Sequence, residues 1–211
     1  MAKIVGEANN DVLFGTGFDD LIIGLGGNDT AYGGNGEDVI YGSSGNDRLY
    51  GDQADDELLG EEGDDKLFGG TGNDLLDGGT GSDFLSGESG NDKLRGGEGF
   101  DALFDGRGSD TLEGGAQSDR FIYQDRAEGG DRIRDFDSGA GGDFLDLSGL
   151  LDKLGYSGDD PRDDGVVRFQ QQGGNTLVRV DADGDGGGSA STLVALEGVV
   201  PRSITDDNLV G

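Results

Sequence analysis

Thirteen consecutive nine-residue units run through residues 6–122 without insertion or deletion. Every unit begins with Gly except the twelfth, which begins with Asp105, and every unit has an apolar eighth residue. A disordered acidic linker has no reason to keep an apolar residue in phase, so the period predicts a repeating structure. The sixth residue is always Asp: Asp11, Asp20, Asp29, Asp38, Asp47, Asp56, Asp65, Asp74, Asp83, Asp92, Asp101, Asp110 and Asp119.

The residue types within one unit predict its local structure. Positions one to four are rich in Gly and predict a turn, whereas positions seven to nine predict a short strand with its eighth side chain on one face. Two units then make one 18-residue coil, and coils stack with strands about 4.8 Å apart. The predicted fold class is all-β: a stub over residues 1–5, then a parallel β-roll over 6–122 whose eighth-position side chains fill a thin core.

Units two apart lie on the same side of such a roll, so the sixth-position aspartates form two columns. Charged, unpaired carboxylates about 5 Å apart repel one another, and burial raises their pKa. A hard divalent cation between successive coils relieves this repulsion. Calcium accepts six to eight oxygens in flexible geometry, whereas magnesium demands a strict octahedron. The sequence has no Cys and no His to ligate softer metals, so several calcium ions are predicted.

The predicted metal ligands are the sixth-position aspartates together with oxygens of the Gly-rich turns, whose backbone approaches closely. Position four is Gly in nine units, and Asn9, Phe18, Ala54 and Gln117 at that position predict incomplete sites. The predicted turn ligands are Gly24, Gly26, Asn28, Gly33, Asn35, Gly42, Ser44, Gly60, Glu62, Gly69, Thr71, Gly78, Thr80, Gly87, Ser89, Gly96 and Glu98.

Units such as GGTGNDLLD and GGTGSDFLS resemble the GGxGxDxUx nonapeptides of RTX (repeats-in-toxin) proteins. The resemblance covers somewhat over half of the chain. It implies a calcium-loaded β-roll in a secreted protein.

After residue 122 the nine-residue period stops, and the composition changes. Strand-like runs follow at 132–136, 144–147, 166–170, 176–180 and 192–196, with a polar loop at 155–164 and a short helical turn at 147–151. These runs predict a β-rich cap over residues 123–211 that closes one end of the roll.

The order DRIRDFDSGAGGDFLDLSGLL and then LVRVDADGDGGGSASTLVALEG resembles the C-terminal region of serralysin-type and related type I-secreted proteins. The resemblance implies an uncleaved C-terminal export signal that the type I secretion machinery recognises. The last six residues, DDNLVG, are similar to the acidic and apolar ending of that family, although Asn208 and a final Gly depart from it.

Two groups of aspartates in the cap leave alternatives open. Asp181, Asp183 and Asp185 match the first half of an EF-hand loop, although its twelfth position falls on Thr192, so a weak calcium site and a solvated acidic loop are equally supported. The second group either caps the last metal site or lies in exposed turns: Asp131, Asp135, Asp137, Asp143 and Asp146.

Aromatic residues recur at position nine every 18 residues. Phe14, Tyr32, Tyr50 and Phe68 are predicted to stack on one outer face, either as a ladder that stabilises the sheet or as a platform for a sugar polymer or protein. The first two units are apolar at positions seven to nine, which predicts that the C-terminal region, a partner or a further domain covers them.

The net charge of −30 argues against nucleic acid or an anionic membrane as a partner. Without Cys or His, disulfides, thiol catalysis, zinc-protease motifs and Ser–His–Asp triads are excluded. No apolar run is long enough for a transmembrane segment, and no cleavable N-terminal signal is recognised.

These observations predict a secreted calcium-binding module that folds on binding calcium outside the cell, with no enzymatic activity. The alternative is an accessory module that binds a polysaccharide or cell-surface component for a larger secreted enzyme or adhesin. A resemblance to the repeat modules of secreted alginate epimerases implies that alternative.

Overall fold

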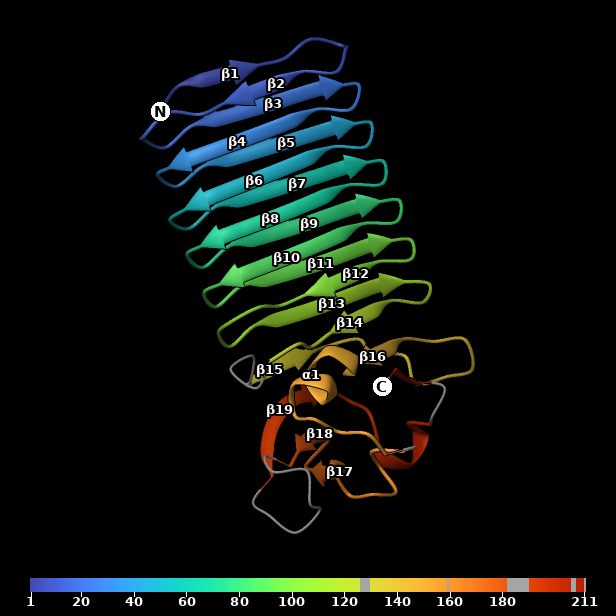
Figure 1. Cartoon of the computed structure of the whole chain (residues 1–211). Coiled ribbons are helices and arrows are strands. Elements are labelled where there is room, and N and C mark those ends of the chain that lie inside the picture. Colours follow the sequence, from blue (N-terminus) through green and yellow to red (C-terminus); the bar gives the residue numbers. More distant parts are fainter. Residues whose placement is uncertain (126–129, 159, 182–189, 206–207, 211) are drawn as a thin grey trace.

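Two sheets wind together along most of the chain in the computed structural model, which describes residues 1–125, 130–158, 160–181, 190–205 and 208–210 (Figure 1). The chain alternates between them, so that odd-numbered strands as far as β15 lie in one sheet and even-numbered strands as far as β16 lie in the other. All neighbours within this stack are parallel. The predicted parallel β-roll is confirmed, with about seven turns over residues 3–133.

The first sheet has the order β1-β3-β5-β7-β9-β11-β13-β15-β19-β18-β17. Its roll strands are β1 (Lys3–Val5), β3 (Leu21–Gly26), β5 (Val39–Ser44), β7 (Glu57–Glu62), β9 (Leu75–Thr80), β11 (Lys93–Glu98), β13 (Thr111–Ala116) and β15 (Asp131–Ile133).

The second sheet has the order β2-β4-β6-β8-β10-β12-β14-β16-β20. Its strands are β2 (Val12–Phe14), β4 (Thr30–Asn35), β6 (Arg48–Gln53), β8 (Lys66–Thr71), β10 (Phe84–Ser89), β12 (Ala102–Phe104), β14 (Arg120–Ile122), β16 (Phe144–Asp146) and β20 (Leu209–Val210).

Eighth-position side chains fill the space between the two sheets, as the pattern predicts. In-register pairs such as Leu58 with Leu76 stack residues 18 apart directly over each other. Each of these side chains is buried from the second unit onward: Ile22, Ala31, Ile40, Leu49, Leu58, Leu67, Leu76, Leu85, Leu94, Leu103, Leu112 and Phe121. A single apolar column from each sheet therefore makes up the core of the roll.

The strands are longer than the sequence pattern predicts. Most span six residues, from position seven of one unit to position three of the next, so the prediction that positions one to four hold no strand is wrong for the first three. Position two has a positive φ, +81° at Ser43 and +76° at Glu61, yet these two residues still pair across coils. Pairing with the neighbouring coil on each side sustains the strand through this bend.

A β-rich cap closes one end of the roll, as predicted. Strands β17 (Val167–Gln172), β18 (Asn175–Val180) and β19 (Ser191–Leu196) are antiparallel to one another, while β19 and β20 continue the parallel stacks on β15 and β16. The predicted helical turn is present as α1 (Ser148–Lys153), and a short 3-10 helix, η1, spans Pro201–Ser203. Both helices are far too short to cross a membrane, and none within the described ranges is suited to do so.

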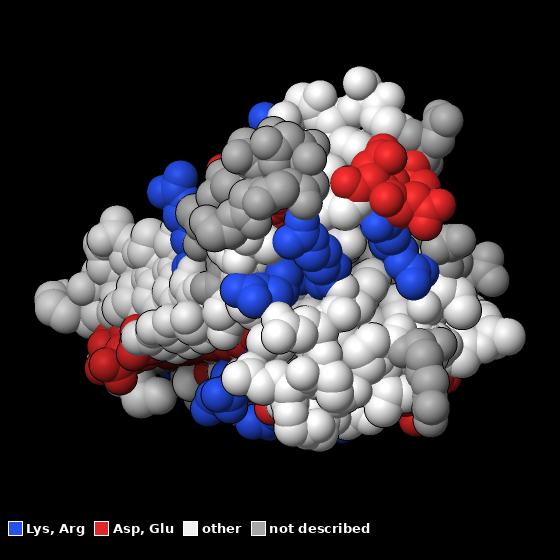
Figure 2. Space-filling model, turned by 90° about the horizontal axis from the view of Figure 1, so that it is seen from below, with Lys and Arg blue, Asp and Glu red and all other residues white. Residues whose placement is uncertain are grey.

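The cap lies at the far end of the roll from β1 and β2 (Figure 1). Of the three predicted covers for the first two units, the C-terminal region is therefore wrong, and a partner or a further domain stays a prediction. Val12 and Phe14 of β2 remain 62% and 65% exposed. Seen from the capped end, Figure 2 shows Lys and Arg side chains gathered near the middle of a largely uncharged face, although the chain as a whole carries −30.

Candidate metal centre

The sixth-position aspartates form two buried columns, one beside each edge of the roll. Within a column, the backbone N–H of each aspartate donates to Oδ1 of the aspartate one coil further on, as from Asp47 to Asp65 at 2.7 Å and from Asp65 to Asp83 at 2.7 Å. The same bond recurs from Asp11–Asp29 to Asp101–Asp119, at 2.6–3.0 Å. One oxygen of each carboxylate is therefore fixed by the coil before it.

The second oxygen, Oδ2, has no hydrogen-bond donor in most of the two columns. This holds, within the described part of the chain, for the eleven sixth-position aspartates from Asp29 to Asp119. Their side chains are at most 3% exposed. A buried acceptor without a donor is costly, and a carboxylate oxygen more so. Eleven such oxygens in register indicate that a ligand supplies the missing positive charge.

Backbone carbonyl oxygens approach the same places. A Cβ built on Gly60 would lie 2.3 Å from Oδ2 of Asp65 and 2.5 Å from the carbonyl oxygen of Gly78; on Gly78 it would lie 2.4 Å from Oδ2 of Asp83 and 2.7 Å from the carbonyl oxygen of Gly96. Only glycine leaves room for this approach. Position one therefore brings a carboxylate oxygen and a carbonyl oxygen, both acceptors, to the same point between coils.

Burial raises the pKa of these carboxyls, because water no longer solvates the charged form. It raises the pKa of Asp38 and Asp74 to about 6, of Asp65 and Asp83 to about 7, and of Asp92 to about 8, with neighbouring aspartates contributing less. At neutral pH the carboxyl groups of the columns can therefore either bind protons or lose them and bind a cation.

The first two units differ from the rest. Oδ2 of Asp11 accepts the N–H of Glu7, and Oδ2 of Asp20 accepts both the N–H and the hydroxyl of Thr16. Hydrogen bonds, first that from Ala2, lower the pKa of Asp20. The protein itself supplies donors to these two Oδ2 oxygens, so the need for a cation is least at the N-terminal end of each column, where position four also departs from Gly.

The predicted ligands at position three end the six-residue strands, and the carbonyl groups of several already accept hydrogen bonds from the preceding coil. Ser44 O accepts the N–H of Gly27, and Glu62 O accepts the N–H of Gly45, at 3.0 and 2.9 Å. A carbonyl oxygen has a second lone pair, so this leaves one available. As metal ligands, the residues at positions one and three stay a prediction.

Position five forms a second ladder that the sequence analysis missed. Oδ1 of Asn28 accepts the N–H of Asn46, and Oδ1 of Asn46 accepts the N–H of Asp64, at 3.0 and 3.2 Å. The signal was present, because position five is Asn, Asp or Ser in most units. Asn28, predicted as a metal ligand, is thus also a link in this outer ladder.

Both aspartate columns continue into the cap. Oδ1 of Asp131 accepts the N–H of Asp110, and Oδ1 of Asp143 accepts the N–H of Asp119, at 2.8 and 2.9 Å. Both carboxyls are buried, and burial raises the pKa of Asp131 to about 7 and of Asp143 to about 6. The alternative that the second group of cap aspartates lies in exposed turns is therefore wrong for these two residues, which extend the columns; that they cap the last metal site stays a prediction.

The other three members of that group are hydrogen-bond acceptors, and two of them, Asp135 and Asp146, accept from strands of the roll. Asp135 accepts the N–H groups of Gly114 and Gly115, and Asp137 accepts that of Gly139.

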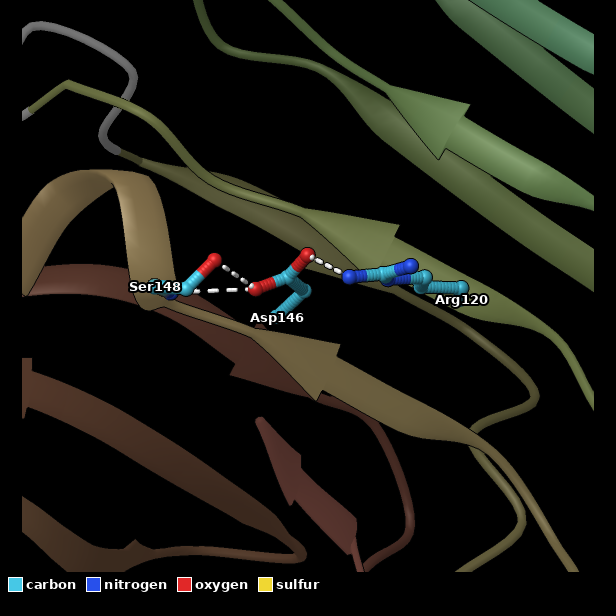
Figure 3. Close-up of polar contacts among 3 residues, drawn as sticks. All are labelled: Arg120, Asp146 and Ser148. Carbon is cyan, nitrogen blue, oxygen red and sulfur yellow. Dashed lines mark hydrogen bonds and ion pairs between the residues drawn. The ribbon is translucent and has the colours of Figure 1, made fainter. Parts of the chain in front are cut away.

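Asp146 lies between Arg120 of β14 and the start of α1 (Figure 3). Its Oδ2 pairs with the Arg120 guanidinium, and its Oδ1 accepts both the N–H and the hydroxyl of Ser148 at 3.0 and 2.7 Å. With both oxygens engaged, Asp146 ties the roll to the cap.

The half EF-hand motif falls only partly within the described residues. Asp181 is fully buried, and its Oδ2 lies 3.6 Å from the Arg168 guanidinium. Asp183 and Asp185 lie outside the described residues. Both interpretations of the motif therefore stay predictions.

The aromatic residues at position nine stack as predicted. Ring centroids are 5.2 Å apart for Phe14 and Tyr32, 4.8 Å for Tyr32 and Tyr50, and 4.9 Å for Tyr50 and Phe68, with interplanar angles of 6–9°. The rings cover one another's faces and present their edges outward. This geometry favours the stabilising ladder.

A hollow of about 750 Å³ lies in the cap, beside β17. The Arg162 guanidinium lies over the Phe169 ring, 5.2 Å from its centroid, and Asp160 accepts the N–H of Arg162. Asp160 at this hollow therefore stabilises a local turn.

The donor set of the columns suits calcium. The available atoms are carboxylate and carbonyl oxygens, which are ligands of hard cations, and they recur between coils along both columns. When bound, the ion supplies the positive charge that the buried Oδ2 oxygens lack. The aspartates and position-one carbonyls from the second coil onward would hold it.

Comparison with known proteins agrees with this donor set. The family model for the RTX calcium-binding nonapeptide repeat matches residues 5–40, 32–67, 59–94, 68–103 and 95–123. No curated protein sequence matches the chain. Among solved structures, the chain is similar to the AlgE6R3 subunit of the mannuronan C5-epimerase from Azotobacter vinelandii, with 31% identity over 76% of this chain and 80% of that one and a TM-score of 0.47. Since the repeat matches together span more than half of its length, the chain belongs to the RTX calcium-binding nonapeptide repeat family.

Proposed function

We propose that this chain is a non-catalytic module that folds when it binds calcium outside the cell and then keeps a secreted protein stable. The observation that carries the proposal is that eleven buried Oδ2 oxygens, aligned along two columns, have no hydrogen-bond donor in the described structure. Carboxylates in that state favour unfolding at neutral pH, and calcium bound between coils reverses the balance. A ligand that binds only the folded state supplies the stability of that state.

The difference in calcium concentration across the cell envelope gives this behaviour a purpose. RTX repeats are typical of type I-secreted proteins. An unfolded chain can pass through a type I exporter, and the cytosol is poor in calcium. In this proposal, residues 6–122 fold as the chain emerges, residues 123–211 cap the roll and carry the export signal, and residues 1–5 precede it.

The test is a calcium titration of the chelated chain, followed by far-UV circular dichroism, with magnesium as the control. We expect a steep, cooperative gain of β signal at millimolar calcium or below, and none with magnesium, because magnesium gives up its waters reluctantly. A β-rich spectrum already present in chelator and unchanged by calcium would refute the proposal.

The alternative is binding of a polysaccharide or a cell-surface component through the aromatic residues at position nine. The stacked geometry speaks against it, since sugars bind to ring faces and the faces of Tyr32 and Tyr50 are covered by their neighbours. Glycan retention by the calcium-loaded chain that disappears in Tyr50→Ala would favour this alternative. Retention unaffected by that change would leave the aromatic residues as a ladder.

A further inference from the structure

Asp105 breaks the repeat at the position where a side chain is otherwise excluded. The other twelve units have Gly at position one. At Gly96, for example, a Cβ would lie 2.3 Å from Oδ2 of Asp101 and 2.6 Å from the carbonyl oxygen of Gly114. Asp105 nevertheless has its side chain fully buried at the equivalent place.

The coil that follows Asp105 differs from the coils along the repeats. Between repeats, partners within a column are 18 residues apart, but Asp110 is followed by Asp131, 21 residues further on, and Asp119 by Asp143, 24 residues further on. The coil beyond Asp105 therefore belongs to the cap and does not repeat the Gly-rich turn. At this junction between the last repeats and the cap, the Asp105 side chain lies where the other units have only the hydrogen atom of a glycine.

Three buried carboxylates meet at the junction. Asp105, Asp110 and Asp131 each offer a carboxylate oxygen within 4.8 Å of the others, and all three side chains are at most 1% exposed. Oδ1 of each accepts a backbone N–H: Asp105 from Gly106, Asp110 from Asp92, and Asp131 from Asp110. These bonds hold the three groups in place.

As in the repeats, Oδ2 of Asp110 indicates a ligand. It is buried and, within the described structure, accepts no hydrogen bond; the same is true of Oδ2 of Asp131. In the repeats the acceptors that converge between coils are carboxylate and carbonyl oxygens, whereas here three carboxyl groups converge, and a hydrogen bond joins the side chains of Asp105 and Asp131. The affinity of a calcium site rises with the number of charged ligands and with its rigidity.

We propose that the last calcium site of this column, between Asp110 and Asp131, gains a third carboxylate from Asp105, binds calcium more tightly than the sites of the repeats and joins the last repeat to the cap. Asp105 and Asp110 come from the turn between β12 and β13, and Asp131 begins β15. An ion held by all three connects two segments that the nine-residue repeat itself does not join. The site depends neither on secretion nor on where the chain folds.

The test compares Asp105→Gly and Asp105→Asn with the unchanged chain. Asp105→Gly introduces the residue that every other unit has at this position, and Asp105→Asn keeps an acceptor for the Gly106 N–H. The matched control is Asp64→Asn, because it also removes one carboxylate and introduces a residue that position five has in other units. Calcium binding by each full-length chain is measured by competition with a chromophoric chelator.

We expect the tightest calcium ion of the unchanged chain to bind at least tenfold more weakly in both Asp105 variants, and within about twofold of its original affinity in the control. An equal affinity for the tightest ion in either folded Asp105 variant would overturn the proposal. If Asp105→Gly fails to fold, Asp105→Asn decides alone.

A crystal structure of the calcium-saturated chain gives a second, independent readout. An ion within coordination distance of all three carboxylates supports the site. Repeat sites filled with calcium beside a junction that holds only water would overturn this site and leave the proposed function intact.

Discussion

Without calcium, the stability of the roll should fall steeply as the pH rises from 5 to 8. Burial raises the pKa of Asp56, Asp65, Asp83 and Asp119 from 3.8 to about 7. A folded-state pKa above the unfolded one means that the folded state binds more protons between the two values. The resulting stability is fully present below about pH 4 and is lost as the pH rises through about 7.

The magnitude decides the outcome. A shift from 3.8 to about 7 corresponds at most to about 4 kcal/mol for one carboxyl. An effective dielectric constant of about 20, which applies even to buried sites, lowers this to about 1–2 kcal/mol for each carboxyl. A domain has a net stability of about 5–15 kcal/mol. The summed free-energy cost of ionising all the buried carboxyls of both columns exceeds that stability.

The assay is far-UV circular dichroism in calcium-free buffers from pH 5 to 8, which lies above the isoelectric point of about 4.1. We expect β structure at pH 5, its loss between about pH 6 and 7, and its recovery at pH 8 when calcium is added. Asp65→Asn should move the metal-free midpoint to higher pH, because an amide oxygen can still accept the Asp47 N–H and carries no charge.

Two outcomes contradict this reasoning. Persistent β structure at pH 8 in chelator would mean that the buried carboxylates carry no net penalty. A chain that is equally unfolded at pH 5 and pH 8 would mean that protonating the carboxylates does not fold the roll. Calcium would then be needed to position the ligands of successive coils as well as to neutralise their charge.

Three further predictions concern single residues. Asp83→Ala should weaken calcium affinity and cooperativity in a titration more than Asp11→Ala, whose Oδ2 already has a protein donor; equal effects would argue against stacked columns. Leu67→Ala should lower the free energy of unfolding in urea, with calcium present, by about 2–5 kcal/mol, because the side chain is fully buried; a change below about 1 kcal/mol would contradict the stacked core. Gly78→Ala should cost about 1–3 kcal/mol in the same assay through its close contacts, whereas Gly174→Ala, with open space around it, should change little.

Much of the fold could be predicted because a single period governs local structure, packing and charge. The phase of the eighth residue places Leu67 and Leu85 in one core column, and the phase of the sixth places Asp65 and Asp83 in one carboxylate column. The strand bounds were less predictable. Glycine-rich segments have little strand propensity of their own, and pairing with neighbouring coils extends the strands into them.

The states of individual aspartates could not be predicted, because identical motif positions have different neighbours. Asp20 and Asp38 both occupy position six, yet Thr16 donates to the first, and Oδ2 of the second lacks a donor in the described structure. The position-five ladder was missed for a related reason: its bonds join residues 18 apart, so they become visible only once the coils are stacked.

By itself, the sequence determined the two sheets, the core, the aspartate columns and the preference for calcium, because each follows from residues in a fixed phase. Only the tertiary structure decided which residues meet where the nine-residue repeat ends. It brings Asp131 and Asp143 into the columns across spacings of 21 and 24 residues and places Asp105 beside Asp110 and Asp131. Contacts across irregular segments depend on how the cap packs, and no local periodicity encodes that packing.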